Sequence, residues 1–223
     1  MAGKIIVIEG SCDGIGKSTQ YKKLIERLKG EGYDIYAHHF PTYDTPHGML
    51  VQKYLNGDYG DRKNLPPYLI ADFYAIDRGV MWQLELKQAY EEGKIILLDR
   101  YTTSSLFYLS SEFDSKEEVI KFVDYNTDFE YNKLGIQAPD LVIFLTAPYD
   151  LVMEMKKNRK QNDGIINDIH EKDLEFMKHV YDNSLFVADY QNWSIVNCAK
   201  DNKLRAIDDI HEEVYQLVKK IGI

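Results

Sequence analysis

The first part of the chain constrains the fold more than any other. An apolar, β-branched run at 4–8 leads into a glycine-rich turn that ends in Gly16-Lys17-Ser18-Thr19, and a helical pattern follows at once. The backbone N–H groups of such a turn, and of the helix that it opens, point into one concavity where the helix dipole favours anions. This order of elements predicts a phosphate-binding loop. Its expected nucleotide-binding residues are Ser11, Cys12, Asp13, Gly14, Ile15, Gly16, Lys17, Ser18 and Thr19.

Within this loop, Lys17 is expected to reach the β- and γ-phosphates of ATP, and the Ser18 hydroxyl to bind Mg²⁺. The standard pattern requires glycine at position 11, where this chain has Ser11, and Gly10 comes one residue early. The loop is therefore one residue longer than the standard form. A plain strand–turn–helix corner with a capping serine is the alternative, but it does not explain a lysine inside the turn.

Length and charge limit the classes of function. The chain has 223 residues and a formal net charge of −9, and 44% of its residues are hydrophobic. We expect one domain over 1–223, with no nucleic acid polymer as a partner, because such binders usually present a basic face. Cys12 and Cys198 lie far apart in the sequence, which favours a reduced protein without a disulfide framework. No apolar run is long enough to span a membrane, so we expect a soluble, cytoplasmic protein.

Apolar runs alternate with helical patterns along the whole chain. The predicted strands are 4–8, 34–40, 94–98, 140–146 and 193–198. Continuous apolar runs such as Ile95-Ile96-Leu97-Leu98 are typical of parallel strands that are buried on both faces. We predict an α/β fold, a doubly wound parallel sheet of about five strands with helices on both faces and ligands at the carboxyl ends of the strands. Residues 41–48 are predicted to form a loop, and the polar segment 158–170 a short lid.

The sequence Asp99-Arg100-Tyr101 follows the run that ends at Leu98. A carboxylate at the carboxyl end of a buried strand, in the same sheet as a phosphate loop, is the expected place for an acid that binds Mg²⁺. Arg100 offers a planar guanidinium for phosphate oxygens. A salt bridge at the strand end is the alternative, and the phosphate loop in the same sheet favours the functional interpretation.

Other polar residues give weaker signals. Tyr74 and Arg78 share one face of a helix predicted from about 66 to 92, so a ring could stack on a base while the arginine binds its edge. Their spacing alone favours a tyrosine in the core and an arginine on a solvated face. Arg159 belongs to a basic cluster that is typical of a helix end, but in a lid it could neutralise a transferring phosphoryl group. His38 and His39 are interpreted as structural, because adjacent residues of a strand point to opposite faces.

Several of these motifs occur in an order found in a known family. They are Ile8-Glu9-Gly10, the loop through Thr19-Gln20, Phe40-Pro41, Phe73-Tyr74-Ala75-Ile76-Asp77-Arg78, Asp99-Arg100-Tyr101 with Ser104-Ser105, and Ala138-Pro139-Asp140-Leu141. Over nearly its whole length the chain resembles the thymidylate kinases, which are P-loop nucleoside monophosphate kinases. The resemblance implies transfer of the γ-phosphoryl group of ATP to dTMP with Mg²⁺, giving dTDP, by a homodimer.

The resemblance also implies roles for individual residues. Asp13 would contact the sugar 3′-hydroxyl and the substrate phosphate, Tyr74 would stack on thymine, and Arg78 would read the base. Arg100 would hold the acceptor phosphate, and Tyr108 would disfavour a ribose 2′-hydroxyl. The remaining implied residues are Phe40 and Ser104 for the substrate, Ser18 and Asp99 for the metal, and Lys17, Arg100 and Arg159 for catalysis. Arg159 is assigned because Gly14 stands where one subclass has a loop arginine.

The chain also departs from the family pattern. Tyr43 stands roughly where the family has an arginine for the acceptor phosphate, and Ile169 where a lid arginine is often found. Leu109 replaces a usual glutamine, and Thr103 a usual polar or acidic residue. Loss of two cations near phosphates would weaken acceptor binding or slow transfer.

These departures leave two other functions open. Tyr43 is compatible with a kinase for another deoxynucleoside monophosphate or for a free deoxynucleoside. The altered loop and the missing lid arginine are compatible with a nucleotide-binding protein whose catalytic site is degraded, although Lys17, Ser18 and Asp99 are intact. The kinase prediction requires that Asp99 lie beside the phosphate loop and that the loop enclose a hollow for an anion.

Overall fold

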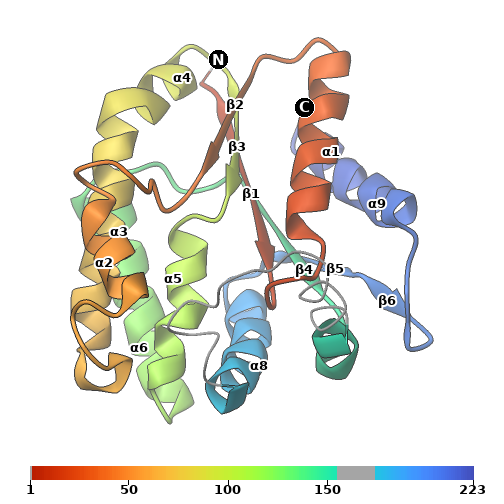
Figure 1. The fold of residues 1–223 in the computed structure, drawn as a ribbon. Coiled ribbons are helices and arrows are strands. Elements are labelled where there is room, and N and C mark those ends of the chain that lie inside the picture. The colour runs from red at the N-terminus through yellow and green to blue at the C-terminus, as the bar shows by residue number, and fades with distance from the viewer. Residues whose placement is uncertain (1, 155–173) are drawn as a thin grey trace.

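The computed structural model describes residues 2–154 and 174–223, and its centre is a parallel sheet (Figure 1). The predicted lid 158–170, with Arg159 and Ile169, lies outside the described residues. The strand order is β2-β3-β1-β4-β5, and every pairing within this sheet is parallel. The strands are β1 (Lys4–Gly10), β2 (Ile35–His39), β3 (Ile95–Asp99), β4 (Leu141–Thr146) and β5 (Ser194–Asn197). Each predicted strand is thus found within a residue or two of its expected position.

Helices fill most of the intervals between these strands. The α-helices are α1 (Lys17–Gly30), α2 (Met49–Asn56), α3 (Pro67–Met81), α4 (Lys87–Glu91), α5 (Thr102–Tyr108), α6 (Lys116–Thr127), α8 (Leu174–Tyr190) and α9 (Ile207–Lys220). Shorter helical turns are the 3₁₀ segments η1 (Arg62–Asn64) and η3 (Ser110–Glu112) and the π segments η2 (Trp82–Leu86) and η4 (Asp128–Lys133). The predicted helix 66–92 is therefore continuous through α3, η2 and α4.

The side chains of the central strands alternate between two layers of core. Ile6, Ile8 and Leu97 belong to the core that α1 and α9 cover, whereas Val7 and Leu98 pack with η2 on the opposite face. Since successive side chains of a strand point to opposite faces, an uninterrupted apolar run is buried on both. Figure 1 shows α1 and α9 on one side of the sheet and α3 to α6 on the other. The predicted doubly wound α/β fold is confirmed.

The topology gathers the carboxyl ends of the strands at one edge of the sheet. The chain leaves β1 toward β3 and β2 on one side and returns to β4 on the other. The strand order therefore reverses at the end of β1, which is where open α/β sheets bind ligands. Residues 41–48 follow β2 at this edge as an irregular loop, as predicted, after a cis Phe40–Pro41 peptide bond.

A small antiparallel ribbon between β5 and α9 was not predicted. It consists of β6 (Ala199–Lys200) and β7 (Lys203–Leu204). Each strand has only two residues, too few to give a periodic hydrophobic pattern. Among the helices of the described residues, none is long and apolar enough to cross a membrane.

Candidate active site

The loop between β1 and α1 begins as an extension of the strand. The backbone N–H of Ser11 donates to the Leu145 carbonyl oxygen at 2.9 Å, which continues the parallel ladder beyond Gly10. Ser11 is fully buried, so the residue in excess of the standard loop length prolongs β1 and leaves the turn itself short. Gly14 and Gly16 have φ angles of 96° and 100°, in the left-handed region that favours glycine.

A hollow of about 230 Å³ lies at this loop. It is several times larger than the ~30 Å³ that one water molecule occupies in the liquid. Its walls combine loop residues with the ends of β2 and β3: Cys12, Asp13, Gly14, Gly16, Lys17, Ser18, Thr19, His39, Asp99 and Arg100. The structure therefore meets both requirements set by the sequence, a hollow at the loop and the Asp99 carboxylate beside it.

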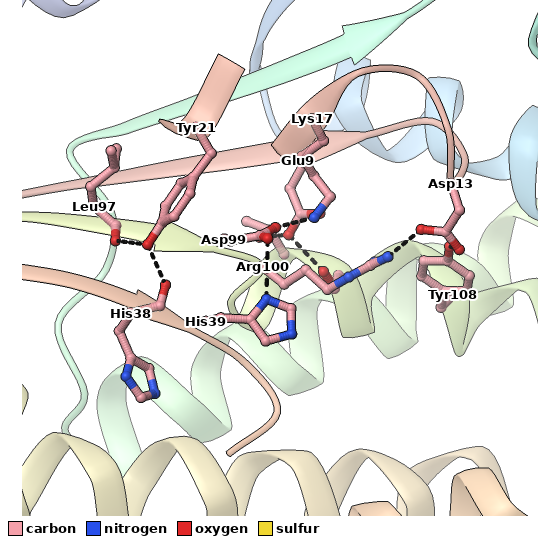
Figure 2. Close-up of polar contacts among 12 residues, drawn as sticks. Glu9, Asp13, Lys17, Tyr21, His38, His39, Leu97, Asp99, Arg100 and Tyr108 are labelled. Atoms are coloured by element: carbon pink, nitrogen blue, oxygen red, sulfur yellow. Dashed lines mark hydrogen bonds and ion pairs between the residues drawn. The ribbon is translucent and has the colours of Figure 1, made fainter. Parts of the chain in front are cut away.

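Asp99 lies between two basic side chains (Figure 2). Lys17 Nζ contacts one carboxylate oxygen of Asp99, and His39 Nδ1 lies 3.1 Å from the other. Burial raises the pKa of Asp99, but the hydrogen bonds and charges of His39 and Lys17 outweigh burial and hold that pKa well below its ordinary value. Burial, together with the nearby Arg100 guanidinium, lowers the pKa of Lys17. Asp99 is therefore ionised and strongly paired.

His39 is a site residue that the sequence did not reveal. The alternation rule was correct, since His38 packs against the Phe40 ring on the other face at a centroid distance of 4.7 Å. The sequence left both histidines as structural residues, and the structure adds that His39 lines the hollow. The strand register brings it there, because His39 pairs with Asp99 at the ends of neighbouring parallel strands.

Glu9 is a second carboxylate near the hollow, and it is completely buried. Its Oε1 atom accepts hydrogen bonds from Thr103 Oγ1 at 2.6 Å and Ser104 Oγ at 2.7 Å. Burial raises the pKa of Glu9, while the positive charges of Arg100 and Lys17 oppose that change. Glu9 thus fixes the first turn of α5 beneath the end of β1, a contact made across 94 positions of sequence that no local pattern reveals.

A second pocket, of about 110 Å³, adjoins the hollow at the phosphate loop. Asp13 and Arg100 line both. The remaining walls of the second pocket are Pro41, Tyr43, Leu55, Tyr74, Ser104, Ser105, Tyr108, Leu109 and Met177. The structure thus brings together five predicted substrate residues, Asp13, Tyr74, Arg100, Ser104 and Tyr108. Met177, from α8, was not predicted.

Arg100 connects the two pockets. Its Nη2 atom donates to Asp13 Oδ1 at 2.5 Å, and its guanidinium carbon lies 5.5 Å from the centre of the Tyr108 ring. Tyr108 in turn donates to Asp13 Oδ2 at 3.5 Å. The φ angle of Arg100 is 69°, a conformation that is costly for a residue with a side chain and is found most often at functional sites.

Two predicted substrate residues lie behind the wall of the second pocket. Phe40 is buried against Tyr101, with ring centres 5.9 Å apart, while the neighbouring Pro41 lines the pocket. Arg78 is buried next to Ser105, which lines the pocket, and its guanidinium is paired with Glu130. Of the residues that depart from the family pattern, Tyr43 and Leu109 line the pocket and Thr103 binds Glu9.

A third hollow, of about 310 Å³, lies on the other side of the phosphate loop. It is lined by Gly14, Ile15, Gly16, Thr19, Gln20, Cys198, Leu204, Ile207 and Ile210. Sequence reasoning missed this hollow because its far wall comes from the β6–β7 ribbon and the start of α9.

The sheet order, the phosphate loop and the adjoining pockets define a P-loop protein with the nucleoside monophosphate kinase fold. The sequence model of the family described as Thymidylate kinase matches residues 8–214, and the chain belongs to the thymidylate kinase family. It is 32% identical over 220 residues to the probable thymidylate kinase of Thermococcus onnurineus, with 96% of each chain covered. It is 31% identical over 223 residues to that of Thermococcus gammatolerans, with 98% of this chain and 97% of the relative covered.

A solved structure is also similar. The thymidylate kinase of Candida albicans superimposes with a TM-score of 0.73, at 23% sequence identity, over 98% of this chain and 92% of that one. The likeness in structure supports the fold.

Proposed function

We propose that this protein transfers the γ-phosphoryl group of ATP to dTMP and forms dTDP. The proposal is supported by membership of the thymidylate kinase family. The observation that carries it is the sharing of Asp13 and Arg100 by the phosphate-loop hollow and the second pocket. Two ligands that meet at these residues would bring a donor phosphate and an acceptor phosphate together.

The donor side is built for a metal-bound triphosphate. Loop residues and Lys17 line the hollow, and Ser18 and Asp99 supply a hydroxyl and a carboxylate. Mg²⁺ prefers such oxygen ligands, and it usually completes its coordination with phosphate oxygens and water. Among the described residues, no group of three or more His, Cys, Asp or Glu side chains could hold a metal ion unaided. A metal bound by Ser18 and Asp99 together with the nucleotide fits this arrangement and would neutralise charge on the phosphate oxygens.

The acceptor side needs positioning more than activation. An oxygen of the dTMP phosphate is already an anionic nucleophile, so no strong base is required, and it attacks the γ-phosphorus in line. Arg100 would hold this phosphate, and Asp13 would hold Arg100 and the sugar. Tyr74 would stack on the base. The apolar side chains of Leu204 and Ile207 in the third hollow offer a surface for the adenine of ATP.

We further propose that the protein is a homodimer. Leu69, Ile76, Val80 and Leu84 recur at helical spacing along α3 and η2, and all four are exposed, Leu84 to 62%. An exposed apolar stripe of this kind marks an interaction surface, and a two-fold axis lets one patch serve both partners. Light scattering after size exclusion tests this: the wild type should elute as a dimer and Ile76→Glu as a monomer. A monomeric wild type would contradict the proposal.

The catalytic proposal is tested by steady-state rates with ATP and Mg²⁺ across dTMP, dUMP, dGMP and thymidine. dTMP should give the highest kcat/KM. A better rate on another acceptor would assign a different substrate. Of the two alternatives, a different substrate is favoured over a degraded catalytic site, because Tyr43 lines the second pocket. ATP binding without transfer to any acceptor would show a degraded catalytic site.

A further inference from the structure

One buried ion pair lies directly behind the second pocket, which is the acceptor pocket of the proposed function. Glu130 lies on η4, the π-helical continuation of α6, and is completely buried, and Arg78 on α3 is 2% exposed. Glu130 Oε2 accepts from Arg78 Nε at 2.6 Å, and Oε1 accepts from Nη2 at 2.6 Å. Thr102 Oγ1 donates to Oε2 at 2.8 Å. The paired bonds fix the plane of the guanidinium as well as its position.

Arg78 also contacts the start of α5, where one of its partners lines the pocket. Its Nη2 atom also donates to Ser105 Oγ at 3.1 Å, and Nη1 lies 3.4 Å from the Tyr101 carbonyl oxygen. A guanidinium only donates, so the Ser105 oxygen must accept from it. Among the described residues, the Ser105 hydroxyl makes no other hydrogen bond, so its own hydrogen is left for another acceptor. Ser105 lines the acceptor pocket, and a ligand there can supply that acceptor.

We propose that Glu130 is a positioning residue that sets which base the acceptor pocket takes, acting through Arg78 and Ser105. This inference rests on the proposed function. Held by Glu130, Arg78 donates to the Ser105 oxygen and so leaves the Ser105 hydroxyl hydrogen to donate into the pocket. This donor favours a base that presents a carbonyl oxygen, such as thymine, over one that presents an amino group, such as cytosine. A site built to donate rejects a donor because two hydrogens then face each other.

A second, partly buried pair provides a control. Arg62, 6% exposed, contacts Glu112, whose side chain is 20% exposed, and neither residue lines the acceptor pocket. Replacing the carboxylate by an amide breaks an arginine–glutamate pair in both places. If both pairs contribute to stability alone, Glu130→Gln and Glu112→Gln should each lower stability and leave the discrimination between bases unchanged. Only the pair behind the pocket should alter discrimination between bases.

The experiment compares wild type, Glu130→Gln and Glu112→Gln by steady-state kinetics with dTMP and dCMP, and by circular dichroism. In Glu130→Gln the KM for dTMP should rise roughly fivefold or more while kcat stays within about twofold, and the preference for dTMP over dCMP should fall by a similar factor. Glu112→Gln should leave the KM for dTMP and the preference for dTMP over dCMP unchanged. Thr102→Val, which removes one bond to Glu130, should move KM and preference in the same direction by a smaller factor and serves if Glu130→Gln does not fold.

The outcomes separate this inference from the proposed function. A wild-type protein that phosphorylates no acceptor would overturn both. A wild-type protein that phosphorylates dTMP, with Glu130→Gln matching Glu112→Gln or Thr102→Val matching wild type in KM and preference, would overturn the role of Glu130 alone. A Glu130→Gln variant that loses kcat without any change in KM or preference would overturn it as well.

Discussion

The acceptor side of the site depends on one buried carboxylate outside it. Asp77 on α3 is 1% exposed, accepts from the Thr42 backbone N–H at 2.9 Å and contacts the Thr42 hydroxyl. Thr42 belongs to the irregular segment 41–48, whose Pro41 and Tyr43 line the acceptor pocket. Asp77 therefore fastens this segment to α3. Replacing Asp77 should loosen the pocket wall and so raise the KM for the acceptor. It should also lower the free energy of unfolding by an amount set by the lost hydrogen bonds.

Replacement of Asp77 by Asn and by Ala leaves different hydrogen-bonding groups in the buried site. Asp77→Asn can keep both contacts in neutral form, since the amide oxygen accepts the N–H and the amide nitrogen donates to the hydroxyl. A hydrogen bond to a charged group contributes about 1 kcal/mol more than a neutral one, so this variant should lose about 2 kcal/mol. Asp77→Ala removes both bonds and leaves a buried N–H unpaired, which should cost about 3–5 kcal/mol. For a chain of this length, each ~1 kcal/mol lowers the melting temperature by roughly 2–4 °C.

Urea unfolding followed by circular dichroism measures both losses, and Asp58→Asn on the exposed loop after α2 controls for removal of a charge. That control should change the unfolding free energy by less than about 0.5 kcal/mol. In both Asp77 variants the KM for the acceptor should rise more than kcat falls. If Asp77→Ala is no less stable than Asp77→Asn, or if neither differs from the control, the carboxylate does not anchor the segment.

Four further predictions follow from single residues. Lys17→Met should lower kcat/KM by about 10²–10³-fold in a coupled assay while the protein stays folded, and wild-type turnover would contradict its role. Burial lowers the pKa of His38, so the unfolded state binds its proton more readily; the melting temperature should rise from pH 5 to 7, with a shallower slope in His38→Gln. Burial raises the pKa of Cys198 to about 11, and Cys12 is also buried, so a disulfide reagent at pH 8 should label neither thiol before unfolding. Replacing Mg²⁺ by EDTA should weaken ATP binding about tenfold or more by calorimetry, and Asp99→Asn should reduce that difference.

The parts of the site that the sequence predicted are those controlled by local order. A β-branched run, a glycine turn and a lysine at a helix start place Lys17 at the end of β1 in any parallel sheet. The run that ends at Leu98 places Asp99 at the same edge, and the register puts Asp99 opposite Ile8 of β1. Because parallel strands align their carboxyl ends, two local patterns were enough to predict that Asp99 lies beside the phosphate loop, where it contacts Lys17 across 82 positions.

The parts that the sequence did not reveal depend on packing between distant elements. Glu130 lies in the π segment that follows α6, and it meets Arg78 of α3 across 52 positions of sequence. Glu9 stood in a recognised motif, yet its bonds to α5 follow from how that helix packs on β1. The third hollow needs a ribbon with two residues in each strand. Periodicity carries no information about any of these contacts.

The charges of the site suggest why its cations are already paired. Lys17 is bound to Asp99, and Arg100 to Asp13, so neither basic group is buried alone. An unpaired buried cation costs several kcal/mol. Under the proposed function, a metal-bound triphosphate would exchange these partners: Lys17 would pair with phosphate oxygens, and Asp99 would help to hold the divalent cation. Each charge would then keep an opposite partner if nucleotide and metal bind together. Lys17 in the loop and Asp99 at the end of the neighbouring strand therefore form one electrostatic unit, in which each charge balances the other.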